Sequence, residues 1–161
     1  MKIAKAKPLT AEELISMYAD TIYRIAFSRL GNVHDSEDIT QEVFIKYIKS
    51  DMTFEDEDHR RKWLIRVTVN AVNSLEKSAC RKRTAPLEEA DAITVEDSDD
   101  ALSIRQAMEK LPEKYRLPIH LFYYEDMTIQ QIAEITDSPE GTVKSLLSRG
   151  RSKLKELLKE E

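Results

Sequence analysis

The chain is poor in the residues that interrupt helices or cross-link a fold. Its 161 residues include one cysteine, three glycines and five prolines. The lone Cys80 cannot form a disulfide within the chain, which fits a reducing compartment. Few glycines and prolines leave few turns, and no segment alternates convincingly between apolar and polar residues as a strand does. We therefore expect an all-α protein.

Two further absences exclude whole classes of protein. No apolar run approaches the roughly 18 residues of a membrane span, and no apolar signal core follows the N-terminal lysines. His34, His59 and His120 share no metal-ligand spacing with one another or with Cys80, and the chain has no glycine-rich phosphate loop. We expect a cytoplasmic protein that is not an enzyme, inserts into no membrane and needs no cofactor. Each histidine is expected at the surface or at a helix end.

The formal net charge of −5 is unevenly distributed. Residues 84–100 carry seven acidic side chains, no basic one and no apolar stripe, which predicts an extended, solvated linker. The linker would join two small helical domains, residues 1–83 and 101–161, because so long a loop within one compact domain is uncommon. Basic clusters flank it: residues 60–83 hold eight basic side chains and one acidic, and residues 141–159 hold six and one. Since charges act over ~10 Å, each cluster can attract an anionic partner despite the acidic total.

Apolar residues at helical spacing predict the order of the helices. They cover residues 11–30, 35–49, 58–70 and 72–83 before the linker, and 100–110, 112–124, 128–136 and 139–159 after it. The third and fourth are almost continuous. The first opens at Thr10, with Glu13 placed for a capping box, and Gly31 and Asn32 end it. The second has an apolar side that consists of Ile39, Val43, Phe44, Tyr47 and Ile48.

The last two helices form a helix-turn-helix pattern. Thr128 can cap the first of them, and Ser138 can cap the second, with Pro139 at its first position. The second helix has a buried stripe of Val143, Leu147, Gly150 and Leu154, with Leu146 beside it. Its other side shows Thr142, Lys144, Ser145, Ser148, Arg149 and Ser152. Short hydrogen-bonding groups and cations near a helix start are typical of a recognition helix in the major groove of DNA.

Two stretches in the N-terminal half add to this pattern. In DSEDITQEVFIKYI, residues 35–48, the polar residues Asp38, Gln41 and Glu42 and the apolar Ile45 lie opposite the apolar stripe. This side fits a partner-docking surface and fits an ordinary solvated face equally well. The second stretch, WLIRVTVNAVNSLEKSACRKR, contains Trp63, Asn70, Asn73, Lys77, Arg81 and Arg83. A ring for stacking, amides for base edges and cations for phosphates suit single-stranded or melting DNA. Trp63 is also compatible with a core position behind such a site.

Three motifs in order carry a family resemblance. They are DSEDITQEVF, then WLIRVTVN with its basic tail, then LPEKYR followed by IAEITDSPEGTVKSLLSRGR. From about Leu14 to Leu158 the chain resembles bacterial RNA polymerase sigma factors of the extracytoplasmic-function (ECF) type, group IV of the sigma-70 family. The resemblance implies a subunit that binds core RNA polymerase and directs promoter-specific transcription initiation. It also implies an anti-sigma factor as an inhibitory partner.

The resemblance assigns expected roles to individual residues. Asp38, Gln41 and Glu42 would dock on the clamp helices of the polymerase beta-prime subunit, and residues 111–116 would lie near the beta flap. The residues expected to open and read the −10 promoter element are Trp63, Arg66, Asn70, Asn73, Ser74, Lys77 and Arg81. Those expected to read the −35 element are Thr142, Lys144, Ser145, Ser148, Arg149 and Arg151. Residues 1–83 would thus be sigma region 2-like and residues 101–161 sigma region 4-like.

The sequence departs from the family pattern at a few positions. Ser74 stands where Asp is frequent, Lys77 and Leu146 stand where Arg is usual, and Gly150 replaces Ala. Glycine inside a helix costs about 1 kcal/mol relative to alanine. Pro118 is expected to kink its helix or to delay the helix start. The alternative function is a stand-alone helix-turn-helix regulator with an N-terminal dimerisation domain, which would have no need of the cluster around Trp63.

Overall fold

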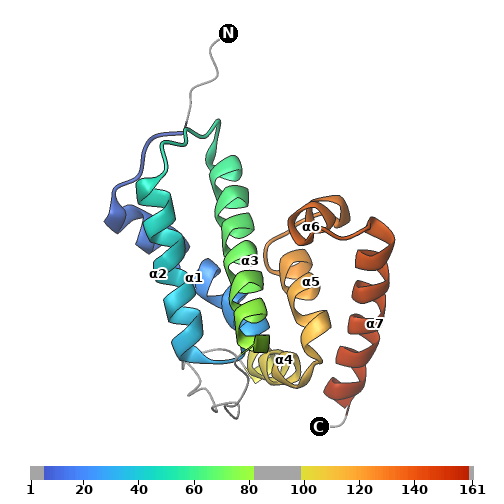
Figure 1. Ribbon diagram of the computed structural model, residues 1–161. Coiled ribbons are helices and arrows are strands. Elements are labelled where there is room, and N and C mark those ends of the chain that lie inside the picture. The colour runs from blue at the N-terminus through green and yellow to red at the C-terminus, as the bar shows by residue number, and fades with distance from the viewer. Residues whose placement is uncertain (1–5, 82–98, 160–161) are drawn as a thin grey trace. The chain divides into compact units, whose positions relative to one another are not determined.

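The computed structural model describes residues 6–81 and 99–159, and every regular element in these ranges is an α-helix (Figure 1). The helices are α1 (Ala11–Leu30), α2 (Val33–Lys49), α3 (Glu57–Arg81), α4 (Asp99–Lys110), α5 (Glu113–Tyr123), α6 (Ile129–Thr136) and α7 (Glu140–Lys159). The all-α prediction is confirmed. The chain divides into two compact units, Met1–Glu88 and Glu89–Glu161. The predicted linker, residues 84–100, lies outside the described residues except for the first two residues of α4, so its limits stay predictions.

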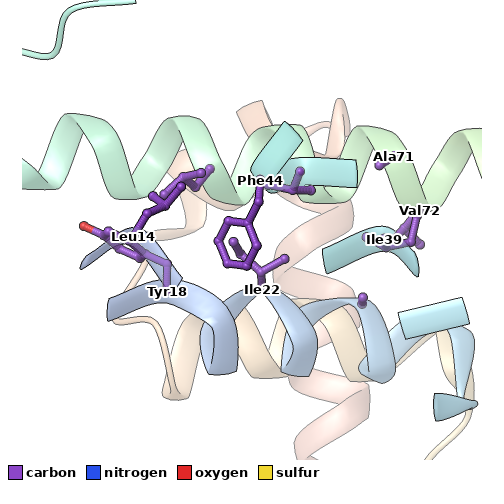
Figure 2. Packing of buried hydrophobic residues seen from close by; sticks show 10 residues of the cluster. Leu14, Tyr18, Ile22, Ile39, Phe44, Ala71 and Val72 are labelled. Carbon is purple, nitrogen blue, oxygen red and sulfur yellow. The ribbon is translucent and has the colours of Figure 1, made fainter. Parts of the chain in front are cut away.

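The first unit is built from α1, α2 and α3 around one apolar core. Leu14, Tyr18, Ile22 and Ala26 recur every four residues and so share one side of α1. The Phe44 ring extends from α2 toward Ile22 (Figure 2). The core is completed by Ile39 and Val43 of α2 and by Leu64, Ala71 and Val72 of α3. Because each helix buries one side in this core, the opposite sides of α2 and α3 face solvent.

Local signals fix the ends of the first helices. The Thr10 hydroxyl accepts a hydrogen bond from the Glu13 N–H at 3.2 Å, as predicted. The capping box is incomplete, because the Glu13 carboxylate accepts from the Thr10 hydroxyl instead of the Thr10 backbone. Gly31 ends α1 with a φ of 69°, a left-handed conformation that glycine adopts without strain. The Asn32 side chain then caps α2, which begins at Val33, two residues earlier than predicted.

The α3 helix is a single helix of 25 residues. The prediction of two helices, 58–70 and 72–83, was wrong at their junction, and the structure has one helix from Glu57 to Arg81. No glycine, proline or capping residue separates Asn70 from Val72. Both Ala71 and Val72 are buried in the core, so tertiary packing holds this part of the helix in place. The whole of α3 can therefore present one continuous outer side.

In the second unit, α6 and α7 form the predicted helix-turn-helix. Thr128 and Gln131 make a complete capping box, with hydrogen bonds of 2.9 and 3.1 Å. A Schellman motif ends α6: the Asp137 N–H donates to Glu134 O and the Ser138 N–H to Ala133 O. The predicted cap of α7 was wrong. The Ser138 hydroxyl donates to Thr136 O at 3.3 Å, and α7 begins one residue later than predicted.

Helices α5 and α7 pack closely at Gly150. A Cβ built on this buried glycine would lie 2.5 Å from Ile119 Cδ1 and 3.1 Å from Tyr115 Cβ. Alanine, the residue expected from the family pattern, therefore has no room unless Ile119 moves. Glycine at position 150 thus lowers the helix propensity of α7, but it allows α5 and α7 to approach closely. Of the two effects predicted for Pro118, a delayed helix start is contradicted, since α5 begins at Glu113 and continues through Pro118, while a kink stays a prediction.

The contact at Gly150 leads to a stability prediction. Gly150→Ala should gain about 1 kcal/mol of helix propensity but lose about 1–3 kcal/mol through overpacking against Ile119, for a net loss of stability. In an Ile119→Val background the Cδ1 atom is gone while the 3.1 Å approach to Tyr115 Cβ stays, so the same alanine should be less destabilising than in the wild-type chain. Urea unfolding followed by circular dichroism measures both effects. Equal, stabilising effects of Gly150→Ala in the two backgrounds would contradict the tight contact.

Candidate nucleic-acid and partner interfaces

Five of the predicted −10 residues with described side chains line the outer side of α3. Arg66, Asn70, Ser74 and Lys77 are exposed, and Asn73 is half-buried. Their spacing of three or four residues places them on one side of the helix. Leu64, Thr68 and Val72 face the other way and are buried. We call this surface the α3 ridge, with half-buried Trp63 at its N-terminal end. Arg81 ends α3, and its side chain lies outside what the structure describes.

The Trp63 ring is held from behind by other aromatic side chains. Its ring meets Phe54 edge-on at a centroid distance of 5.6 Å and Tyr47 edge-on at 6.0 Å. Phe54 and Tyr47 are themselves stacked at 6.0 Å. Edge-to-face and stacked pairs at these distances are favourable, so the three rings fix one another. From the sequence, Trp63 could be a stacking ring for DNA or a core residue behind such a site. In the structure it packs on the core and also remains half-exposed at the end of the α3 ridge.

Arg60 has a role that the sequence did not predict. Its side chain is only 1% exposed, although it stands in a run of three basic residues. It forms an ion pair with Glu57, donates to the Lys7 carbonyl, and lies over the Phe54 ring at 5.4 Å. The Tyr18 hydroxyl donates to the same Glu57 carboxylate at 2.7 Å, and burial together with this hydrogen bond raises the pKa of Tyr18. Arg60 is therefore part of the core network and is withdrawn from any ligand.

Acidic residues near the start of α3 partly neutralise the basic cluster. Lys62 Nζ lies 2.7 Å from an Asp58 carboxylate oxygen, and Arg61 lies 3.5 Å from the other. The hydrogen bond from Lys62 lowers the pKa of Asp58. Further along α3, Glu76 accepts two hydrogen bonds from Arg29 of α1, at 3.2 and 2.5 Å. This bidentate pair ties α3 to the end of α1 beside Lys77. The positive field of the first unit is therefore smaller than the count of basic residues suggested.

A mixed polar and apolar surface covers the outer side of α2. Asp38, Gln41 and Glu42 are exposed, as predicted. Ile45 and Ile48 share this side and are 51% and 62% exposed, and Met52 follows in the next loop at 47%. Assigning Ile48 to the buried stripe was wrong, because Val43, Phe44 and Tyr47 already fill that side of the helix. We call the exposed set the α2 surface; it consists of Asp38, Gln41, Glu42, Ile45, Ile48 and Met52. Ile45 was expected on this side from the sequence, whereas the exposure of Ile48 and Met52 beside it was not.

The six predicted −35 residues are all exposed on α7. They do not form a single line. Ser145, Ser148 and Arg149 lie opposite the buried Val143 and Leu147, whereas Lys144 and Arg151, seven residues apart, share one flank of the helix. On that flank Arg151 Nη1 donates to the hydroxyl of exposed Tyr123 at 3.4 Å. Tyr123 is a surface residue that the sequence analysis did not single out, because it looked like an ordinary part of helix 112–124.

Among the described residues, no three His, Cys, Asp or Glu side chains are arranged to hold a metal ion. His120 lies in the last turn of α5 but is buried, stacked on Tyr124 at 5.0 Å, with its Nε2 3.7 Å from Glu125. The expectation of a helix-end position holds for His120, while its burial was not foreseen. In the same part of the chain, no helix has both the length and the apolarity needed to cross a membrane.

Comparisons with known proteins match both units. Residues 14–84 match the family model for sigma-70 region 2, and residues 101–154 match that for sigma-70 region 4. SigW of Bacillus subtilis, an ECF RNA polymerase sigma factor, is 32% identical over 168 residues, which covers 92% of this chain and 88% of SigW. The ECF sigma-E factor of Escherichia coli is 27% identical, covering 73% of this chain and 70% of that protein.

A solved structure shows the same fold. The sigma factor RpoE from Bartonella quintana, crystallised with the anti-sigma factor NepR, has a TM-score of 0.71 at 21% identity, covering 92% of this chain and 96% of that one. The alternative, a regulator with an N-terminal dimerisation domain, is not favoured, because the N-terminal unit matches sigma-70 region 2. Since regions 2 and 4 match in order and an ECF sigma factor aligns with 92% of the chain, this protein belongs to the ECF group of the sigma-70 family of RNA polymerase sigma factors.

Proposed function

We propose that the three exposed helix sides divide the work of this sigma factor. The α2 surface docks on the beta-prime clamp helices of core RNA polymerase, the α3 ridge opens and reads the −10 element, and α7 reads the −35 element. The observation that carries the proposal is the segregation of side chains. Hydrogen-bonding and cationic groups gather on α3 and α7, while two exposed isoleucines, Ile45 and Ile48, stand among carboxylates on α2.

The α2 surface has the composition of a protein interface. Ile45 and Ile48 supply an apolar centre, and Asp38, Gln41 and Glu42 supply a polar rim. Burying such a centre gives affinity, while the rim fixes orientation and partner choice. The acidic side chains favour a basic partner surface. This arrangement supports docking through α2 rather than an ordinary solvated face.

The α7 surface has the composition of a major-groove reader. The outward hydroxyls of Ser145 and Ser148 and the guanidinium of Arg149 can reach base edges, while Lys144 and Arg151 on the flank suit phosphates. The contact between Arg151 and Tyr123 places a further hydroxyl beside that flank, where it would add a phosphate contact. Residues Leu111–Arg116, near the start of α5, would lie toward the beta flap.

The α3 ridge suits separated strands better than duplex DNA. Asn70 and Asn73 present amides that can pair with base edges, and Trp63 presents part of a ring on which a base can stack. Lys77 adds a cation for the backbone, while the pairs around Asp58 limit non-specific attraction at the other end. The ridge would thus favour captured bases over duplex phosphates.

The chain itself performs no reaction in this proposal. Core polymerase supplies the chemistry in the cytoplasm, and the sigma factor supplies recognition and strand capture, with the two DNA-facing units raising each other's effective concentration at one promoter. RpoE was crystallised with the anti-sigma factor NepR. By analogy, an anti-sigma factor would hold this chain inactive by covering the α2 surface or the α3 ridge.

Transcription with purified core polymerase tests the proposed function. The template is a library of promoters randomised upstream of a fixed transcript, and the RNA 5′ ends are sequenced with and without the chain. We expect initiation that depends on the chain and enriches short elements near −35 and −10. Duplex binding without any chain-dependent initiation would contradict the proposal.

The α2 surface gives a specific prediction. Ile48→Glu should weaken binding to core polymerase by about ten-fold or more, because a charge replaces an apolar contact at the interface centre. Ile15→Glu is the matched control, since Ile15 is 50% exposed on α1. Fluorescence anisotropy of labelled chain titrated with core polymerase measures both. An equal loss in the two variants would remove Ile48 from the interface.

The α3 ridge gives a second prediction. Asn70→Ala should reduce open-complex formation, detected by permanganate reactivity of unpaired thymines, by about ten-fold, with little change in duplex binding. Ser148→Ala on α7 should instead weaken duplex binding more than the opening step itself, because in the proposal its hydroxyl faces duplex DNA. Losses of equal size in opening and duplex binding for Asn70→Ala would exclude it from strand capture.

A further inference from the structure

We propose that Arg60 is a positioning residue for promoter opening. By holding Phe54 it sets the Trp63 ring at the end of the α3 ridge, and so links the segment before α1 to strand capture. This inference rests on the proposed function of the α3 ridge. It concerns a residue that touches no DNA and acts through its neighbours.

The burial of Arg60 is poorly explained by stability alone. A guanidinium that is 1% exposed has lost its hydration, and its Nε has no hydrogen-bond partner among the described residues. Buried ion pairs recover little of that loss, and a well-packed apolar side chain frequently serves stability equally well. What a buried arginine supplies instead is geometry, because its planar fork binds several groups in fixed directions. The groups it binds therefore indicate its role.

Arg60 joins segments that are distant in the sequence. Its contacts are the Glu57 carboxylate in the first turn of α3, the Lys7 carbonyl before α1, and the Phe54 ring between α2 and α3. The Ala6 N–H also donates to the Phe54 carbonyl at 2.9 Å. Phe54 is thus held on its ring by Arg60 and on its backbone by the N-terminal segment. If that segment moved away, Phe54 would lose its backbone bond to Ala6, and Arg60 would lose its bond to the Lys7 carbonyl.

Phe54 in turn helps to orient Trp63, together with Tyr47. Phe54, Tyr47 and Trp63 form a closed set of three ring contacts, with centroid distances of 5.6 to 6.0 Å. Phe54 is 3% exposed and has little freedom, whereas Trp63 is half-buried and emerges beside Arg66. A displaced Phe54 would leave the indole with one edge-on contact, that of Tyr47, instead of two. The stacking platform at the end of the α3 ridge would then lose its fixed orientation.

The chain offers a direct reporter for this coupling. Trp63 is its only tryptophan, so intrinsic fluorescence reports the environment of that ring alone. Arg60→Met removes the charge and its directed contacts while keeping an unbranched side chain. Phe54→Leu keeps a buried apolar residue but removes both the ring contacts and the cation–π contact. Arg24→Met is the control, since it makes the same charge change at an exposed position of α1.

The experiment combines three readouts on the full chain. They are the Trp63 emission maximum with acrylamide quenching, the affinity for core polymerase, and open-complex formation at a chain-dependent promoter. We expect Arg60→Met and Phe54→Leu to increase quenching of Trp63 and to lower opening about ten-fold, with core affinity within about two-fold of wild type. Arg24→Met should leave all three unchanged. If Arg60→Met fails to fold, as judged by far-ultraviolet circular dichroism, Phe54→Leu carries the same test.

A double variant separates positioning from general destabilisation. If Arg60 acts through the indole, Arg60→Met should lower opening no further in a Trp63→Phe background. Additive losses, a parallel loss of core affinity, or altered Trp63 quenching with wild-type opening would overturn the inference. Failure of the wild-type chain to open any promoter would instead overturn the proposed function, and the quenching readout would still show whether Arg60 sets Trp63.

Discussion

The burial of one side of each helix in a small core is the constraint on which the functional surfaces depend. In the first unit, Phe44 and Val43 of α2 and Leu64 and Val72 of α3 pack against α1. An α-helix has 3.6 residues per turn, so residues three or four apart share one side. Burying these residues therefore fixes which residues of α2 and α3 reach solvent. The same logic applies to α7, where the burial of Val143, Leu147 and Gly150 leaves the serines and Arg149 outward. The partner-facing chemistry is thus oriented by residues that never touch a partner.

Charge has a more local role than the sequence totals suggest. The basic cluster of residues 60–83 loses Arg60 to the core, and its next two members pair with Asp58. Glu76, the single acid in that range, is taken up by Arg29. What remains on the described part of the α3 ridge is two cations, Arg66 and Lys77, among the amides of Asn70 and Asn73 and the hydroxyl of Ser74. Such a surface gains less from counterion release and more from contacts that only separated bases can make, which fits strand capture rather than duplex scanning.

Much of the fold follows from local sequence signals. Thr10, Gly31 and Thr128 each act on the backbone next to them, so the helix ends they mark were predictable. The errors lie where distant residues decide. Val72 joins two predicted helices because the core buries it, and Ile48 is excluded from the core because neighbouring side chains fill that side. The burial of Arg60 depends on Lys7 and Phe54, and no local pattern marks it. The exposure of the predicted α7 residues, in contrast, follows from helical spacing alone.

Site-specific cross-linking tests the division of labour between the two units most directly. A photoreactive amino acid is placed at exposed Ser74 on α3 or at exposed Ser145 on α7, in complexes of the chain with core polymerase and a chain-dependent promoter. The expected result is that position 145 cross-links to upstream duplex before and after opening, whereas position 74 cross-links to the −10 region and more strongly once its strands have separated. Cross-links from both positions to the same segment, or from position 74 to duplex alone, would contradict the assignment of strand capture to α3.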